Sequence, residues 1–194
     1  MIINENQLIE ECLKGTEGAF KAIYDNYKGY VYTICIRYGI SQIEVKDSMQ
    51  TIFTEIFLSL KNYNSKKAKF KTWLTRITIN QILMLKRKNR ITYEGLEDEK
   101  INLYSDNSSD FVEAKIDEEI LYGILNKMPQ KYITVFNLFI IDGYTHKEIA
   151  ELLNIAENTS RVLLHRGRSW AMEELNFHFK TTVSNFKKNK KKFI

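Results

Sequence analysis

Proline, glycine and cysteine are all scarce in this sequence of 194 residues, and each shortage excludes a class of protein. One proline and eight glycines provide little turn material for an all-β fold and favour helices. Two cysteines, Cys12 and Cys35, are too few for a disulfide framework and lack metal-ligand spacing. No apolar run approaches the roughly 20 residues that span a bilayer, and the first residues lack the order of a signal peptide. We therefore expect a cytoplasmic protein without a membrane segment, a metal or a cofactor.

The charge of the chain alternates along its length. Residues 1–90 carry a net charge of +7, residues 91–125 carry −8, and residues 126–194 carry +6. The middle stretch is also rich in serine and asparagine, which predicts an acidic flexible linker between two helical domains. We place a four-helix domain at 1–90, the linker at 91–112, a second domain at 113–176 and a basic tail at 177–194. Two basic domains on a tether favour a polyanionic partner, although solvated cationic faces would give the same charge pattern.

Residues 41–60 give the clearest helical pattern of the first domain. Ser41 and Glu44 have the spacing of a capping box, and apolar residues follow at steps of three and four. The opposite face is polar and is interpreted either as solvated surface or as a docking surface for another protein. Its residues include Asp47, Gln50, Thr51 and Thr54.

A basic and aromatic loop over residues 61–69 leads into a helix over 70–90. Lysines bind phosphates, aromatic rings can stack on an unpaired base, and asparagine amides can read a base edge. This mixture suits a nucleic-acid strand whose bases have left the duplex. Trp73, Leu74 and Ile77 share one helical face and are expected in the core, whereas Phe70 suits either role.

The last domain has the pattern of a helix-turn-helix. An apolar helix over 132–141 ends at Asp142-Gly143, with Gly143 placed for a left-handed cap. Thr145 and Glu148 form a second predicted capping box, which opens a short helix over 147–153. A turn at 154–156 then precedes a longer basic helix over 157–175.

One stripe of the last helix is expected to face the core, and the other faces are expected to reach DNA. The core stripe comprises Ser160, Leu164, Gly167, Ala171 and Leu175. Arg161, Val162, His165 and Ser169 then face outward, with Arg166 and Arg168 on the flanks. An arginine can hold guanine with two hydrogen bonds, and a valine can pack on a thymine methyl group.

These motifs, in this order, resemble the extracytoplasmic-function group of bacterial sigma factors, the promoter-recognition subunits of RNA polymerase. The resemblance rests on residues 43–53, on residues 70–80, and on residues 128–168 with their helix-turn-helix. It covers roughly residues 8–90 and 115–175, and it leaves the tail outside.

The resemblance implies roles for particular residues. The polar face of 41–60 would dock on the largest polymerase subunit, and Arg87 would meet the DNA backbone. The acidic linker resembles the segment that threads the RNA-exit path. Residues implied at the minus-ten element are Asn62, Tyr63, Asn64, Lys66, Lys67, Lys69, Phe70, Asn80 and Arg87. Residues implied at the minus-thirty-five element are Tyr144, Lys147, Thr159, Arg161, Val162, His165, Arg166 and Arg168.

The sequence also departs from the family pattern. Ala156 occupies a position where the family favours a capping serine, and Ser160 replaces a usual apolar core residue. Gly167 replaces a usual alanine, and Met84 stands where an aspartate is common. The tail is expected to be a disordered basic extension that adds salt-sensitive, non-specific DNA affinity.

The expected function is therefore a monomeric sigma factor without catalysis, whose partners are core RNA polymerase, promoter DNA and, as commonly in this group, an anti-sigma factor. The alternative is a stand-alone helix-turn-helix regulator, which would bind duplex DNA without polymerase and usually as a dimer. A nucleic-acid enzyme is disfavoured because no phosphate-binding glycine loop, His-Glu-x-x-His motif or Gly-x-Ser-x-Gly motif occurs.

Overall fold

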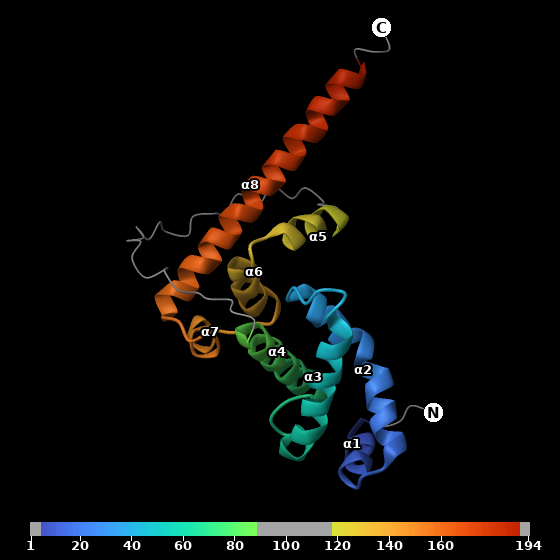
Figure 1. Cartoon of the computed structure of the whole chain (residues 1–194). Helices are drawn as coiled ribbons and strands as arrows, with labels where there is room; N and C mark the ends of the chain where they lie inside the picture. The colour runs from blue at the N-terminus through green and yellow to red at the C-terminus, as the bar shows by residue number, and fades with distance from the viewer. Residues whose placement is uncertain (1–4, 89–117, 191–194) are drawn as a thin grey trace. The chain divides into compact units, whose positions relative to one another are not determined.

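The computed structural model describes the backbone of residues 5–88 and 118–190, and the side chains within these ranges except at 88, 118, 119, 121, 122 and 180–190. The described elements are all helical, as the sequence predicted (Figure 1). The chain divides into two compact units, Met1–Thr92 and Tyr93–Ile194. The predicted linker at 91–112 lies outside the described residues.

Unit 1 contains α1 (Glu5–Leu13), α2 (Glu17–Arg37), α3 (Val45–Ser59), the short 3₁₀ helix η1 (Leu60–Asn62) and α4 (Phe70–Lys88). Helices α2, α3 and α4 pack on one another, and α1 packs on α2 (Figure 1). Their apolar stripes meet in a core in which Ile23, Ile34, Ile52, Ile56 and Leu74 are almost completely buried. The core arises because each helix repeats apolar residues at three- and four-residue steps.

The prediction that a helix begins at Ser41 was wrong by four residues. Ser41 and Glu44 do interact, since the Glu44 N–H donates to Ser41 Oγ at 3.2 Å and Ser41 Oγ donates to Glu44 Oε2 at 2.7 Å. However, the N–H groups of Glu44 and Val45 both donate to the Ser41 carbonyl and close a tight turn there. Helix α3 therefore begins at Val45.

Unit 2 contains α5 (Glu118–Lys127), α6 (Gln130–Phe136), the π-helical segment η2 (Asn137–Ile141), α7 (His146–Leu153) and α8 (Glu157–Lys190). Helix α8 packs on α5, α6 and α7 (Figure 1). Gly143 has φ +73° and Asn154 has φ 55°, so the connections before and after α7 both use left-handed backbone. The capping box of Thr145 and Glu148 is confirmed.

A disordered tail is expected from the sequence after residue 176, but α8 continues as one helix to Lys190, and residues 191–194 lie outside the described residues. Residues 168–190 contain neither glycine nor proline, so no residue in the sequence stops the helix once it has started.

Candidate nucleic-acid interface

The exposed face of α8 carries most of the side chains predicted to read DNA. Arg161, His165 and Ser169 are exposed, and Arg166 and Arg168 are half-buried on the flanks. The predicted core stripe is buried from Ser160 through Leu164 and Gly167 to Leu175, with Ala171 half-buried. This stripe packs closely on α6 at Gly167. A Cβ atom at this position, which glycine lacks, would lie only 3.3 Å from Tyr132 Cβ.

Val162 was predicted to face outward, and the structure contradicts this. Its side chain is only 7% exposed, and the neighbouring Leu163 is fully buried. The reason is that α8 packs on α6 and on α7 at the same time, so its covered face is wider than one stripe. Val162 therefore belongs to the core of unit 2 and cannot reach a thymine methyl group in this arrangement.

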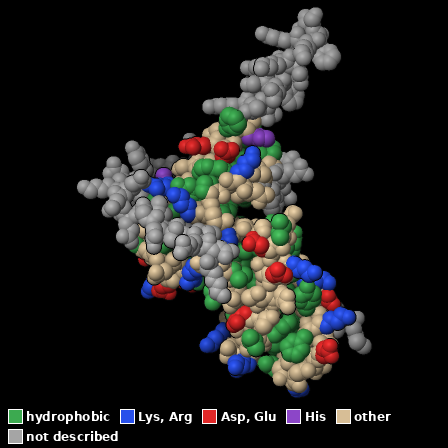
Figure 2. All heavy atoms as spheres, in the orientation of Figure 1, with side chains coloured by type: hydrophobic (Ala, Val, Ile, Leu, Met, Phe, Trp, Pro, Cys, Tyr) green, Lys and Arg blue, Asp and Glu red, His purple; other side chains and the backbone are tan. Residues whose placement is uncertain are grey.

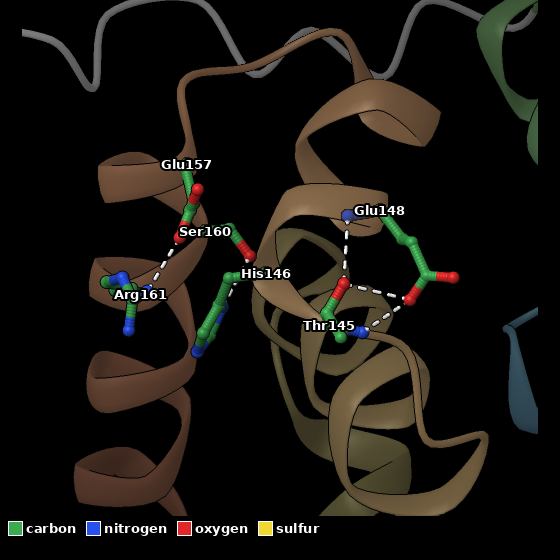
Figure 3. Close-up of polar contacts among 6 residues, drawn as sticks. All are labelled: Thr145, His146, Glu148, Glu157, Ser160 and Arg161. Atoms are coloured by element: carbon green, nitrogen blue, oxygen red, sulfur yellow. Dashed lines mark hydrogen bonds and ion pairs between the residues drawn. The ribbon is translucent and has the colours of Figure 1, made fainter.

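A polar cluster joins the two helices of the helix-turn-helix (Figure 3). His146 Nδ1 lies 2.9 Å from Ser160 Oγ, and the imidazole ring stacks on Phe139 with a centroid distance of 4.4 Å. The next residue on α8, Arg161, donates to Glu157 Oε1, one helical turn earlier, at 2.6 Å. Burial lowers the pKa of His146, and nearby Arg161 lowers it further. The cluster therefore favours a neutral imidazole.

The start of α7 is held by reciprocal hydrogen bonds. The Glu148 N–H donates to Thr145 Oγ1 at 3.2 Å, and the Thr145 N–H donates to Glu148 Oε2 at 2.8 Å (Figure 3). These bonds satisfy two backbone donors of the first helical turn. Two residues predicted at the minus-thirty-five element lie on either side of His146: Tyr144 is half-buried and Lys147 is exposed. The predicted contact Thr159 is half-buried on α8.

In unit 1, the loop before α4 is internally ordered. The Lys66 N–H donates to Asn64 Oδ1 at 2.9 Å, and the Tyr63 hydroxyl donates to the Ala68 carbonyl at 3.2 Å. These bonds leave the lysines on the outside. Exposed residues of the loop are Asn62, Asn64, Lys66, Lys67 and Lys69.

Phe70 was predicted at the minus-ten contact, but its side chain is completely buried. Its ring contacts Tyr63, Tyr27 and Trp73, at centroid distances of 5.3, 5.4 and 5.6 Å respectively. Tyr63 is itself half-buried and packs on both Phe70 and Trp73. The structure therefore gives Phe70 a scaffold position under the loop, where it cannot stack on a base.

Further along α4, Asn80 and Arg87 are exposed, as direct contacts with DNA require. Between them Lys86 is buried, at 8% exposed, and its Nζ donates to the Tyr38 carbonyl at the end of α2. Burial lowers the pKa of Lys86 to about 8. Lys86 thus ties the last turn of α4 to α2 next to Arg87.

The predicted docking residues lie together on the exposed side of α3. Asp47, Gln50, Thr51 and Thr54 are all exposed, and both threonine hydroxyls donate to backbone carbonyls one turn earlier. Lysine, arginine and acidic side chains are interspersed on the drawn face of unit 1 (Figure 2). Charge sign alone therefore does not outline an interface there.

Sequence reasoning missed the pairing of His146 with Ser160, the pairing of Glu157 with Arg161 and the burial of Lys86. The sequence did indicate that Ser160 has a hydrogen-bond partner, because Ser160 is a polar residue on a predicted core stripe. The spacing of four between Glu157 and Arg161 was also visible. Nothing local marked His146 or Lys86, because their partners are distant in sequence.

The parts of the chain that are described also bear on metal binding, membrane crossing and cysteine reactivity. There, no cluster of three His, Cys, Asp or Glu residues could hold a metal, and no helix is long and apolar enough to cross a membrane. Cys12 and Cys35 are buried, and burial raises the pKa of Cys35 to about 12. Neither thiol forms a ready nucleophile at neutral pH.

Comparison with known proteins matches both units. The family model for Sigma-70 region 2 matches residues 23–91, and that for Sigma-70 region 4 matches residues 118–170. The chain is 32% identical to the ECF RNA polymerase sigma factor SigW of Bacillus subtilis, over 86% of this chain and 94% of that one. It is 27% identical to the ECF sigma factor SigE of Mycolicibacterium smegmatis, over 80% and 61%. Among solved structures, the sigma factor RpoE of Bartonella quintana, in complex with the anti-sigma factor NepR, aligns with a TM-score of 0.50 at 16% identity, over 81% and 96%.

Proposed function

The chain belongs to the extracytoplasmic-function (ECF) group of RNA polymerase sigma factors, and from that premise we propose how its residues direct promoter-specific initiation. It binds core RNA polymerase and recognises the minus-ten and minus-thirty-five elements of a promoter. The observation that carries this function is the match to SigW over nearly the whole of both chains. The function is also supported because the Sigma-70 region 2 model matches within unit 1 and the region 4 model matches within unit 2.

At the minus-thirty-five element, α8 would lie in the major groove with Arg161 and His165 toward the bases. The exposure of both side chains on one face supports this placement. Thr159, Arg166 and Arg168 would lie at the edges of that face, while Tyr144 and Lys147 would hold the phosphates beside the start of α7. Val162, which is buried in the core of unit 2, would stabilise the position of α8.

At the minus-ten element, the ordered loop before α4 would receive a base that has left the duplex. Asn62, Asn64 and Asn80 would offer amides, while Lys66, Lys67, Lys69 and Arg87 would hold the backbone. Tyr63 and Phe70 would support the loop from beneath. Flipping a base costs a few kcal/mol, which contacts in the pocket must offset.

The exposed face of α3 would bind the polymerase through Asp47, Gln50, Thr51 and Thr54. We propose that the polymerase supplies the catalysis, that the protein acts in the cytoplasm as a monomer, and that an anti-sigma factor is a further partner. The last point is supported by the related RpoE, which was solved with NepR bound.

A run-off transcription assay with sigma-free core polymerase tests this function. We expect discrete start sites preceded by two shared elements. Asn80→Ala and Arg161→Ala should each reduce specific initiation at least about tenfold, while core binding stays intact. Asn26→Ala and Lys127→Ala change exposed residues elsewhere in the same units and should leave initiation unchanged. Flat transcription together with specific duplex binding by the protein alone would favour the stand-alone regulator instead.

A further inference from the structure

One polar contact in unit 2 is not used by any of the proposed DNA contacts. His146 opens α7, and its Nδ1 lies 2.9 Å from the hydroxyl of Ser160 on α8 (Figure 3). Ser160 is completely buried and directly precedes Arg161 in the chain. On its other side, the imidazole stacks on Phe139 at an interplanar angle of 23°. The ring is therefore held between η2 and α8.

Helices α7 and α8 pack on each other, and this contact differs in kind from the contacts of their buried apolar side chains. The side chains of Ile149 and Leu153 on α7 and of Leu163 on α8 are buried and apolar, and apolar contacts have no preferred direction. A hydrogen bond between two fixed atoms is directional, and a buried hydroxyl needs a partner. The histidine therefore fixes the turn of α8 that carries Arg161.

We propose that His146 is a positioning residue for Arg161, and that its hydrogen bond to Ser160 makes recognition of the minus-thirty-five element depend on the proton that His146 carries. This inference rests on the proposed function. It adds a linkage between base reading and pH that the proposed contacts do not contain.

The charges around His146 give the direction of this linkage. On α8, Arg161 and Arg168 disfavour the imidazolium, and Glu157 favours it. Segment η2 contributes no ionisable side chain, Asp142 follows it, and Glu148 lies on α7 itself. Burial is the largest effect and, with Arg161, holds the pKa of His146 below its usual 6.5 in the free chain.

Bound DNA changes this balance. Tyr144 and Lys147 lie two residues before and one residue after His146, so phosphates held by them would add negative charge near the ring. Their negative charge favours the imidazolium and raises its pKa in the complex. The complex then binds more protons than the free chain, so binding tightens as pH falls. One proton limits the gain to about tenfold per pH unit.

The test uses holoenzyme, made of core polymerase and the full chain, on a promoter and on the same promoter with a scrambled minus-thirty-five element. On the scrambled element Arg161 has no bases to read, so the phosphates are not held in register beside His146. The ratio of the two affinities therefore retains the effect at His146 and cancels pH effects that are independent of sequence. His165 also faces DNA and is one of only three histidines in the chain, so each protein is measured both with His165 and with His165→Gln. We expect the ratio to rise about two- to tenfold between pH 8 and pH 6.

Three further variants separate positioning from mere folding. His146→Gln retains a hydrogen-bond partner for Ser160 and should abolish the dependence on pH while keeping a measurable ratio. Ser160→Ala should lower the ratio at both pH values, and Ser160→Thr should restore it. An unchanged pH slope in His146→Gln overturns the inference alone. The absence of any preference for the promoter at every pH in the chain that retains both histidines overturns the proposed function and, with it, this inference.

Discussion

Glu157 and Arg161 form an ion pair of 2.6 Å, one helical turn apart on the exposed face of α8 (Figure 3). Both side chains are about half exposed, at 47% and 54%. The carboxylate therefore restrains the arginine that is proposed to read a base, and it places a negative charge beside the approaching phosphates.

We predict that Glu157→Gln raises affinity for scrambled duplex and lowers the preference for the correct minus-thirty-five element. Exposed ion pairs contribute about 0.2–1 kcal/mol, so the change should be up to about fivefold. Holoenzyme binding to the two promoters measures both quantities. Glu173→Gln, an exposed change farther along α8, is the matched control. A gain in preference would contradict the restraining role.

Ala156→Ser should stabilise unit 2 by about 1 kcal/mol. The Ala156 carbonyl accepts the Ser160 N–H at 3.2 Å, so residue 156 occupies the N-cap position of α8 but has no side-chain acceptor. Urea unfolding followed by Trp170 fluorescence, in a Trp73→Phe chain, measures the difference. Ala171→Ser lies within the helix and should give no gain. Equal effects at both positions would rule out a capping effect.

Phe70→Leu should preserve initiation, whereas Phe70→Ala should lower the free energy of unfolding of unit 1 by about 3–5 kcal/mol. The reason is that Phe70 is completely buried among Tyr27, Tyr63 and Trp73. Urea unfolding and run-off transcription check the two variants. If a fully folded Phe70→Leu protein lost recognition of the minus-ten element, Phe70 would have a direct contact with DNA after all.

Asp47→Arg should weaken binding to core polymerase by about tenfold, which corresponds to 1.4 kcal/mol. The substitution reverses the charge at the exposed side of α3. Fluorescence anisotropy of the labelled chain with core polymerase measures the affinity. Asp25→Arg reverses an exposed charge on α2 and serves as the control. Unchanged binding in Asp47→Arg would place the docking surface elsewhere.

The free energy of unfolding of unit 1 should rise between about pH 8 and pH 9.5. In the folded state burial lowers the pKa of Lys86 to about 8, whereas the unfolded lysine keeps its proton up to about 10.5. Across this window the unfolded state binds more protons, so stability increases with pH. Urea unfolding at both pH values should show the rise in the parent chain and in Lys21→Met, but not in Lys86→Met. A rise that persists in Lys86→Met would assign it to another group.

Local sequence patterns predicted those features that depend on neighbours in the chain. The capping box at Thr145 and Glu148 and the left-handed Gly143 follow from steric and hydrogen-bonding rules within a few residues, and both are confirmed. The all-helical fold followed in the same way from the scarcity of glycine and proline.

The errors arose where a second or third element decides burial. Val162 is covered because α7 and α6 both pack on α8, and Phe70 is covered by rings from α2 and from the loop. Helical periodicity indicates one buried face per helix, so it predicts neither the burial of Val162 nor that of Phe70. For the same reason, the sequence did not reveal the bond between His146 and Ser160, which joins residues 14 positions apart.

The continuous α8 also acts as a spacer. At 1.5 Å per residue, the 29 residues from Arg161 to Lys190 extend about 44 Å along the helix axis, which is the length of about 13 base pairs of B-DNA. The helix end therefore cannot share the base pairs that Arg161 reads. Contacts made by the basic end must fall on a separate site, and shortening α8 from its C-terminus should alter those contacts while leaving the minus-thirty-five sequence preference intact.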